Sequence, residues 1–142
     1  MTLAMTKQER EAFLAEVRVG VLSVSEKGRG PLTIPIWYTY EPGGELRFVT
    51  SRESRKSKLL SEMKRISLCV HDETLPYRYV SVEGPIVAIE KADLERDVRY
   101  FGHRYLGPAG GDRHAERVKD EEMVLARMRP ERWYTVDFGK LG

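Results

Sequence analysis

The segment from Leu46 to Val70 most narrows the folds that this chain can adopt. A strand-like run ends at Thr50, and the residues from Ser51 to Lys58 then read Ser-Arg-Glu-Ser-Arg-Lys-Ser-Lys. Amides in the first turn of a helix lack intrahelical partners and carry partial positive charge, so hydroxyls and cations beside them suit a phosphate. The alternative is that these cations form the solvated face of an amphipathic helix. The segment therefore predicts a strand, a helix and a strand, with a candidate anion site at the helix start.

Composition limits the classes of protein that remain. The 142 residues suit a single domain spanning 1–142, and 41% hydrophobic with 32% charged residues suits a soluble globular protein without a membrane span. The balance of 24 Lys and Arg against 22 Asp and Glu argues against a nucleic-acid partner. The region from Met1 to Glu16 lacks the features of a secretory signal, so we expect a cytoplasmic protein. Cys69 is the single cysteine and cannot form an internal disulfide.

The rest of the chain alternates strand and helix patterns around that segment. Thr6 and Glu9 have capping-box spacing. Pro35 predicts a bulge or an unpaired point in its strand, and Gly84-Pro85 predicts a bend. The pattern indicates a mainly β protein with helices (α+β), an antiparallel barrel whose ends the helices plug, although periodicity does not specify strand order. The expected strands are 19–24, 32–40, 45–50, 65–70, 77–89, 123–128 and 133–138, and the expected helices are 7–16, 54–63, 92–105 and, with a glycine-rich break before it, 113–121.

Several short motifs occur in an order that resembles a known superfamily. They are Gly20-Val21-Leu22-Ser23-Val24, Pro35-Ile36-Trp37-Tyr38, Thr50 with Ser54-Arg55-Lys56 and Leu60, Val82-Glu83-Gly84, Arg104-Tyr105-Leu106-Gly107-Pro108, and Asp137 with Lys140-Leu141-Gly142. The chain resembles the split β-barrel flavoproteins that include pyridoxamine 5'-phosphate oxidase, and more closely the actinobacterial reductases built around the deazaflavin coenzyme F-420. The resemblance implies an FMN-binding-like split barrel of antiparallel, Greek-key type. Leu59 stands where relatives often have an Asn, which removes one group able to bind the cofactor tail.

The resemblance also implies a site. The cofactor ring would lie along Thr33, Pro35, Ile36 and Trp37, and its phosphate would meet Thr50, Ser54, Arg55, Lys56 and Lys58. Tyr77, Tyr79 and Trp133 would line the substrate cleft. Each assignment has an ordinary structural alternative, because a strand proline often protects an edge and strand aromatics are often core or dimer contacts. A homodimer is implied too, since a second subunit completes the cleft in the family.

The implied activity is hydride transfer from reduced F-420 to a planar, electron-poor small-molecule acceptor, a quinone or an α,β-unsaturated carbonyl. This chemistry needs no protein nucleophile or metal, and the sequence has no evident set of residues for either. The histidines at 71, 103 and 114 lack metal-ligand spacing, so we expect surface or hydrogen-bonding roles and leave open whether one donates a proton. The alternatives are an FMN-binding flavoprotein on the same barrel and a non-catalytic binder of a planar cofactor such as haem.

Overall fold

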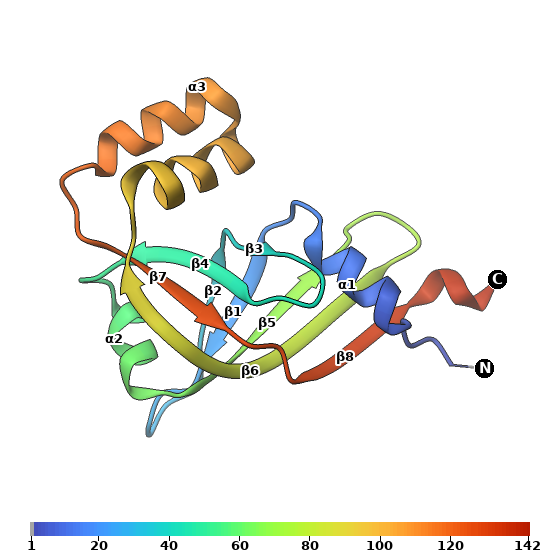
Figure 1. Ribbon diagram of the computed structural model, residues 1–142. Helices are drawn as coiled ribbons and strands as arrows, with labels where there is room; N and C mark the ends of the chain where they lie inside the picture. Colours follow the sequence, from blue (N-terminus) through green and yellow to red (C-terminus); the bar gives the residue numbers. More distant parts are fainter. Residues whose placement is uncertain (1) are drawn as a thin grey trace.

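The computed structural model describes residues 2–142, in which strands dominate and helices cover their ends (Figure 1). The mainly β fold predicted from the sequence is confirmed. The strands are β1 (Gly20–Val24), β2 (Leu32–Ile36), β3 (Thr39–Tyr40), β4 (Leu46–Ser51), β5 (Arg65–His71), β6 (Arg78–Lys91), β7 (Met123–Met128) and β8 (Arg132–Asp137). The helices are α1 (Lys7–Ala15), α2 (Arg55–Glu62), the π-helical η1 (Leu94–Arg99), α3 (Tyr100–Val118) and the 3-10 helix η2 (Phe138–Leu141).

The strands form one antiparallel sheet that curls on itself. Their order is β2-β1-β5-β6-β7-β4-β3, and β8 pairs with the first half of β6. The first and last strands of this order, β2 and β3, are separated in the chain only by Trp37 and Tyr38. The sheet therefore curls until its two edge strands, β2 and β3, come together at this dipeptide.

The predicted strand 32–40 breaks at that dipeptide for a specific reason. The backbone amide of Tyr38 donates to the hydroxyl of Tyr105, 3.0 Å away, and the Tyr38 carbonyl lies 2.9 Å from the same hydroxyl. Both backbone groups are thus bound by a side chain instead of a neighbouring strand. Pro35, in contrast, stays in regular register opposite Val21, so the predicted bulge there is wrong. Because β2 is an edge strand, a missing amide at Pro35 is tolerated.

The long strand β6 passes from one half of the barrel to the other. It pairs with β5 as far as Pro85, and with β7 from Ile86 onward, with a register shift between Ile86 and Ala88. The bend predicted at Gly84-Pro85 therefore lies beside the observed irregularity. At Gly84 the backbone of Arg129 comes so close that an added Cβ would lie 1.8 Å from its carbonyl oxygen. Only glycine fits at this crossing.

The barrel interior is filled by the inward-facing residues of each strand. Alternation is clear in β5, where Ile66, Leu68 and Val70 are buried. Helix α1, which begins at the predicted Thr6 capping box, covers one end of the barrel. The hydroxyl of the fully buried Tyr38 donates to the Leu14 carbonyl at 2.8 Å and so ties α1 to the core. No helix within residues 2–142 is long and apolar enough to cross a membrane.

A helical arm that consists of η1 and α3 connects β6 to β7 and lies above β4, beside the barrel (Figure 1). Helix α3 is kinked at Gly107, where φ is 78°, and Pro108 begins its second half. Gly102 and Gly111 allow the two halves to cross closely, since an added Cβ on Gly102 would lie 3.0 Å from the Gly111 Cα. The predicted glycine-rich break therefore narrows to Gly107, and the glycines after it lie within the helix.

We expect Gly84→Ala to lower the free energy of unfolding by about 3 kcal/mol or more, because the Arg129 backbone must move to admit a methyl group. Gly30→Ala is the control, because nothing lies within 4 Å of its added Cβ. Urea denaturation of both variants measures the difference. Equal stability of the two variants would show that the β6 crossing is not constrained.

Candidate functional site

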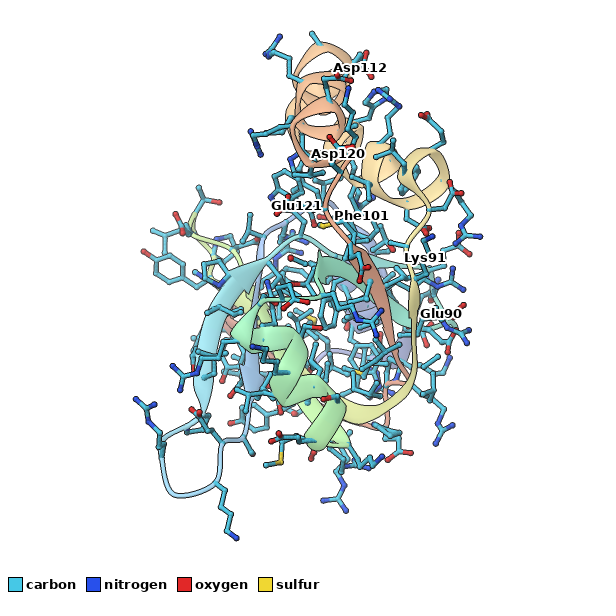
Figure 2. All side chains as sticks on the ribbon, turned by 90° about the vertical axis from the view of Figure 1, so that its left-hand side faces the viewer. Glu90, Lys91, Phe101, Asp112, Asp120 and Glu121 are labelled. Atoms are coloured by element: carbon cyan, nitrogen blue, oxygen red, sulfur yellow. The ribbon has the colours of Figure 1, made fainter. Side chains whose placement is uncertain are left out.

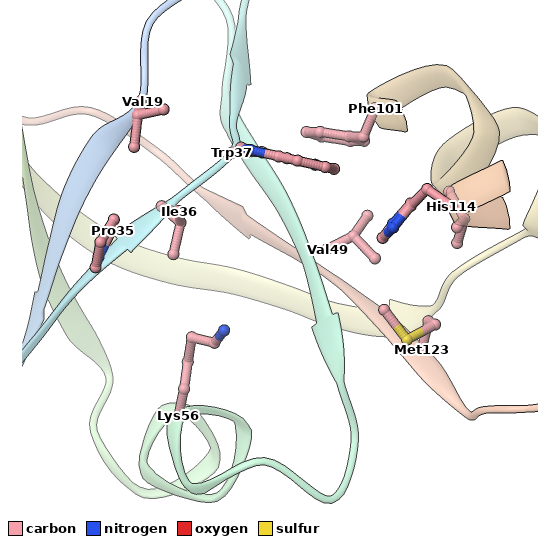
Figure 3. Close-up of a pocket in the computed structure, with 10 residues that line it drawn as sticks. Val19, Pro35, Ile36, Trp37, Val49, Lys56, Phe101, His114 and Met123 are labelled. Carbon is pink, nitrogen blue, oxygen red and sulfur yellow. The ribbon is translucent and has the colours of Figure 1, made fainter. Parts of the chain in front are cut away.

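A pocket of about 250 Å³ opens beside the point where the two edges of the sheet meet (Figure 3). One wall comes from β2 and the residue that follows it, another from α2, and the rest from β4, β7, the arm and the residue that precedes β1. Its lining residues are Val19, Pro35, Ile36, Trp37, Val49, Lys56, Val98, Phe101, His114 and Met123. The pocket therefore brings together Pro35, Ile36, Trp37 and Lys56 from the residues predicted to bind a cofactor.

Lys56 is the cation that reaches this pocket (Figure 3). It lies in the first turn of α2, directly after the Ser54 N-cap and Arg55. Burial lowers the pKa of the Lys56 ammonium, and no carboxylate among residues 2–142 opposes that shift. A half-buried ammonium without a counter-ion gains from a bound anion, particularly beside the free amides of a helix start.

The other residues of the basic segment have different surroundings. Arg55 forms an ion pair with Glu26 from the β1–β2 turn. Lys58 lines a separate, larger cavity of about 930 Å³ on another side of α2. The Ser54 hydroxyl accepts from the Ser57 amide at 3.1 Å and donates to the Ser51 carbonyl at 2.8 Å, and it lies 3.2 Å from the Thr50 hydroxyl. The two hydroxyls thus shape the helix start that presents Lys56.

Trp37 forms the aromatic wall of the pocket and is held on two sides by the arm. Its ring stacks on Tyr105, with centroids 5.1 Å apart and planes 5° from parallel. The imidazole of His114 meets it edge-on at 5.2 Å. The Tyr105 hydroxyl also lies 2.7 Å from the Arg18 carbonyl, and Arg104 donates to the Ala15 carbonyl at 3.2 Å. These contacts fix the arm, and with it one side of the pocket, against the barrel.

The remaining predicted site residues lie outside this pocket. Thr33 is exposed on the outer face of β2, and its hydroxyl donates to the Pro31 carbonyl at 3.3 Å. Tyr77 is half-exposed, and Tyr79 packs against Tyr134 on the outer face of the sheet, with ring centroids 6.0 Å apart. Trp133 lies beneath the Arg10 guanidinium, 4.6 Å from its ring centroid, at the α1 end of the barrel. The three predicted cleft aromatics therefore do not meet Trp37 in one chain.

Sequence reasoning missed the contribution of the arm. Phe101 lies on its barrel side, whereas Asp112 lies at its far end (Figure 2). The apolar helical stripe that contains Val98 and Phe101 is visible in the sequence. It predicts that these side chains are buried but not which surface they pack against. For His114, the sequence carries no signal that links it to Trp37. Val49 and Met123 enter through the pairing of β4 with β7, which requires the strand order.

The geometry suits a flat, largely apolar group that carries an anion. Aliphatic and aromatic side chains line most of the pocket, Lys56 lies across it from His114, and its volume is slightly below the roughly 300 to 1,000 Å³ of small-molecule sites. A single chain thus encloses part of such a ligand. Within residues 2–142, no three His, Cys, Asp or Glu side chains are placed to hold a metal ion.

Comparison with known proteins places this geometry in context. A family model described as pyridoxamine 5'-phosphate oxidase matches residues 6–137. No curated protein sequence matches the chain significantly. A solved structure described as an F-420 reductase is 22% identical, with a TM-score of 0.71 over 87% of this chain and 94% of its own.

Two further solved structures share the fold. The conserved hypothetical protein Rv2991 from Mycobacterium tuberculosis is 26% identical over 99% of this chain and 89% of its own, with a TM-score of 0.79. An FAD-binding protein from Mesorhizobium loti is 18% identical over 93% and 94%, with a TM-score of 0.63. The split barrel predicted from the sequence is confirmed by these comparisons.

Proposed function

We propose a function for this chain, which belongs to the pyridoxamine 5'-phosphate oxidase family. It is an oxidoreductase that uses reduced F-420 to transfer a hydride to a planar, electron-poor acceptor. A quinone or an α,β-unsaturated carbonyl compound is the acceptor class. The observation that carries the proposal is the pocket between Trp37 and Lys56, which combines an aromatic wall with a half-buried cation that has no ion-pair partner in the described part of the chain.

The residues of the pocket fit a phosphate-bearing deazaflavin. Lys56 and the first-turn amides of α2 would hold the phosphate, because both offer positive charge in a partly desolvated position. Trp37, Ile36 and Pro35 would hold the planar ring through apolar contact. When bound, the reduced ring supplies the hydride, and the protein supplies orientation and a water-poor environment.

The choice of F-420 rests on the motif resemblance, because structures described as an F-420 reductase and as an FAD-binding protein share the fold over 87% and 93% of this chain. The Arg104-Tyr105 pair, part of the motif that resembles the deazaflavin group, makes the contacts that hold the arm on the pocket. FMN carries the same combination of planar ring and phosphate and is the alternative that the assays below separate.

We also propose that the protein works as a homodimer joined through the outer face of β1, β5, β6 and β8. The register places Val21, Cys69, Ser81 and Tyr134 in one row across this face, and Tyr79 lies beside it. This row contains no charge, as expected for the core of a subunit interface. Pro35 continues the row opposite Val21 and also lines the pocket, so a partner on this face would extend the pocket wall.

The first expectation concerns cofactor affinity. Lys56→Ala should weaken binding of oxidised F-420 about ten- to a hundredfold, because one charged hydrogen bond contributes about 1.5–3 kcal/mol. Lys7→Ala is the control, because Lys7 lies on α1 and pairs with Glu11 at 2.9 Å. Fluorescence titration measures both. Equal losses in the two variants would place the anion elsewhere.

The second expectation concerns assembly. Sedimentation at micromolar concentration should show twice the 16.4 kDa mass of the chain. Tyr134→Glu should shift the equilibrium toward the monomer, since it places a charge at the centre of the proposed interface. Tyr100→Glu, at an exposed tyrosine of the arm, is the matched control. A monomer for the unaltered protein would rule out the shared site.

The activity is tested by following the reoxidation of reduced F-420 against a panel of quinones and α,β-unsaturated carbonyl compounds. We expect turnover with at least one of them, with NADPH plus FMN run in parallel. Turnover with FMN alone would move the assignment to an FMN-dependent flavoprotein. Tight binding of either cofactor with no turnover would contradict an enzymatic role and favour a carrier.

A further inference from the structure

His114, which holds the edge of Trp37, is the polar side chain of the pocket that has so far no role toward a ligand. Its imidazole extends from α3 into the pocket, toward Val49 (Figure 3). Its Nδ1 accepts a hydrogen bond from the guanidinium of Arg117, 2.9 Å away. Because arginine donates and cannot accept, the neutral ring must carry its proton on Nε2. Within residues 2–142 this is the hydrogen bond that fixes the ring, and it leaves the Nε2–H group for a ligand.

The surroundings of His114 keep its imidazole neutral. Burial lowers its pKa below the ordinary value of 6.5, Arg117 lowers it further, and Glu121, in the turn that follows α3, opposes the shift. Across the pocket, the charged group from α2 is Lys56, another cation, while β7 contributes Met123. A neutral imidazole that offers one N–H group is a hydrogen-bond donor without the desolvation penalty of an ion.

We propose that His114 is the specificity-determining hydrogen-bond donor of the pocket, and that its Nε2–H group binds a carbonyl oxygen of a planar ring lying against Trp37. The edge-on contact of the imidazole with Trp37, at 5.2 Å, places the donor beside the aromatic wall. The choice of a planar ring rests on the proposed function. Both the cofactor ring and a quinone or enone acceptor carry carbonyl oxygens, so the shared chemistry defines the ligand and experiment must separate the two sources.

A single donor of this kind selects among ligands of similar shape. The remaining lining residues near it, including Phe101 and Val49, are apolar and discriminate weakly between similar flat molecules. A ligand without a carbonyl at this position leaves the N–H group desolvated and unpaired, which is unfavourable. Arg117 acts as a positioning residue, because its hydrogen bond to Nδ1 sets the tautomer.

The tautomer can be measured without any cofactor. In the ¹⁵N-labelled protein, the side-chain nitrogen shifts of His114 should show a protonated Nε2 and an unprotonated Nδ1 at pH 7. Arg117→Leu should populate the other tautomer as well. A protonated Nδ1 in the unaltered protein would overturn the proposal.

Ligand binding tests the donor itself and separates the two sources. His114→Phe keeps an aromatic ring beside Trp37 and removes the donor, whereas His114→Gln restores an N–H group. If the cofactor is the partner, His114→Phe should weaken binding of oxidised F-420 or FMN about three- to tenfold, with recovery in His114→Gln. If the acceptor is the partner, cofactor affinity should stay unchanged while kcat/KM for menadione, a naphthoquinone, falls by a similar factor and recovers in His114→Gln.

Failure of the proposed function is distinguishable from failure of this inference. Should the unaltered protein bind neither cofactor, the proposed function fails, and direct binding of menadione to the free protein still tests the donor. Weaker menadione binding by His114→Phe than by the unaltered protein would then support it. Unchanged affinities and kinetics in His114→Phe, or no binding of any of the three ligands, would overturn it.

Discussion

The pocket depends on one hydroxyl group, that of Tyr105. It accepts from the Tyr38 amide and lies within hydrogen-bonding distance of the Tyr38 and Arg18 carbonyls. The dipeptide where the sheet edges meet is thereby bound to the arm instead of to another strand. The same residue stacks its ring on Trp37 and fixes the aromatic wall. Barrel closure, arm position and pocket shape therefore all involve this one side chain, and the proposed chemistry needs all three.

The charged side chains of α2 and of the arm differ in whether they have an ion-pair partner. Arg55 is neutralised by Glu26, and in the arm Asp112 accepts from both Arg99 and His103 at 2.8 and 2.7 Å. Lys56 has no such partner within residues 2–142, and burial disfavours its charged form. A ligand anion would relieve this penalty. The two ends of the pocket thus differ in character, with a cation at α2 and a neutral donor at His114.

Local sequence patterns predicted the elements of this barrel but not their assembly. Alternation in β5 and β6, the Thr6 cap and the basic start of α2 depend on neighbouring residues, so they are readable from sequence. The break at Trp37 and Tyr38 required a hydroxyl 67 residues beyond Tyr38, which periodicity cannot reveal. The site was predicted along the strand and helix that carry Pro35 and Lys56. His114 and Phe101 were not predicted as site residues, because the spacing of apolar residues in a helix does not tell which surface the arm covers.

Hydrogen exchange with and without saturating oxidised F-420 tests the central claim most directly, that the ligand binds between Lys56 and the arm. The account predicts slower amide exchange at the start of α2, around Trp37, and along the arm from Phe101 to His114, because bound ligand would fill the space between these elements. FMN measured alongside should protect the same segments if it shares the site. Protection confined to the larger cavity around Ile89–Leu94, or no change at α2 and the arm on binding, would contradict the account.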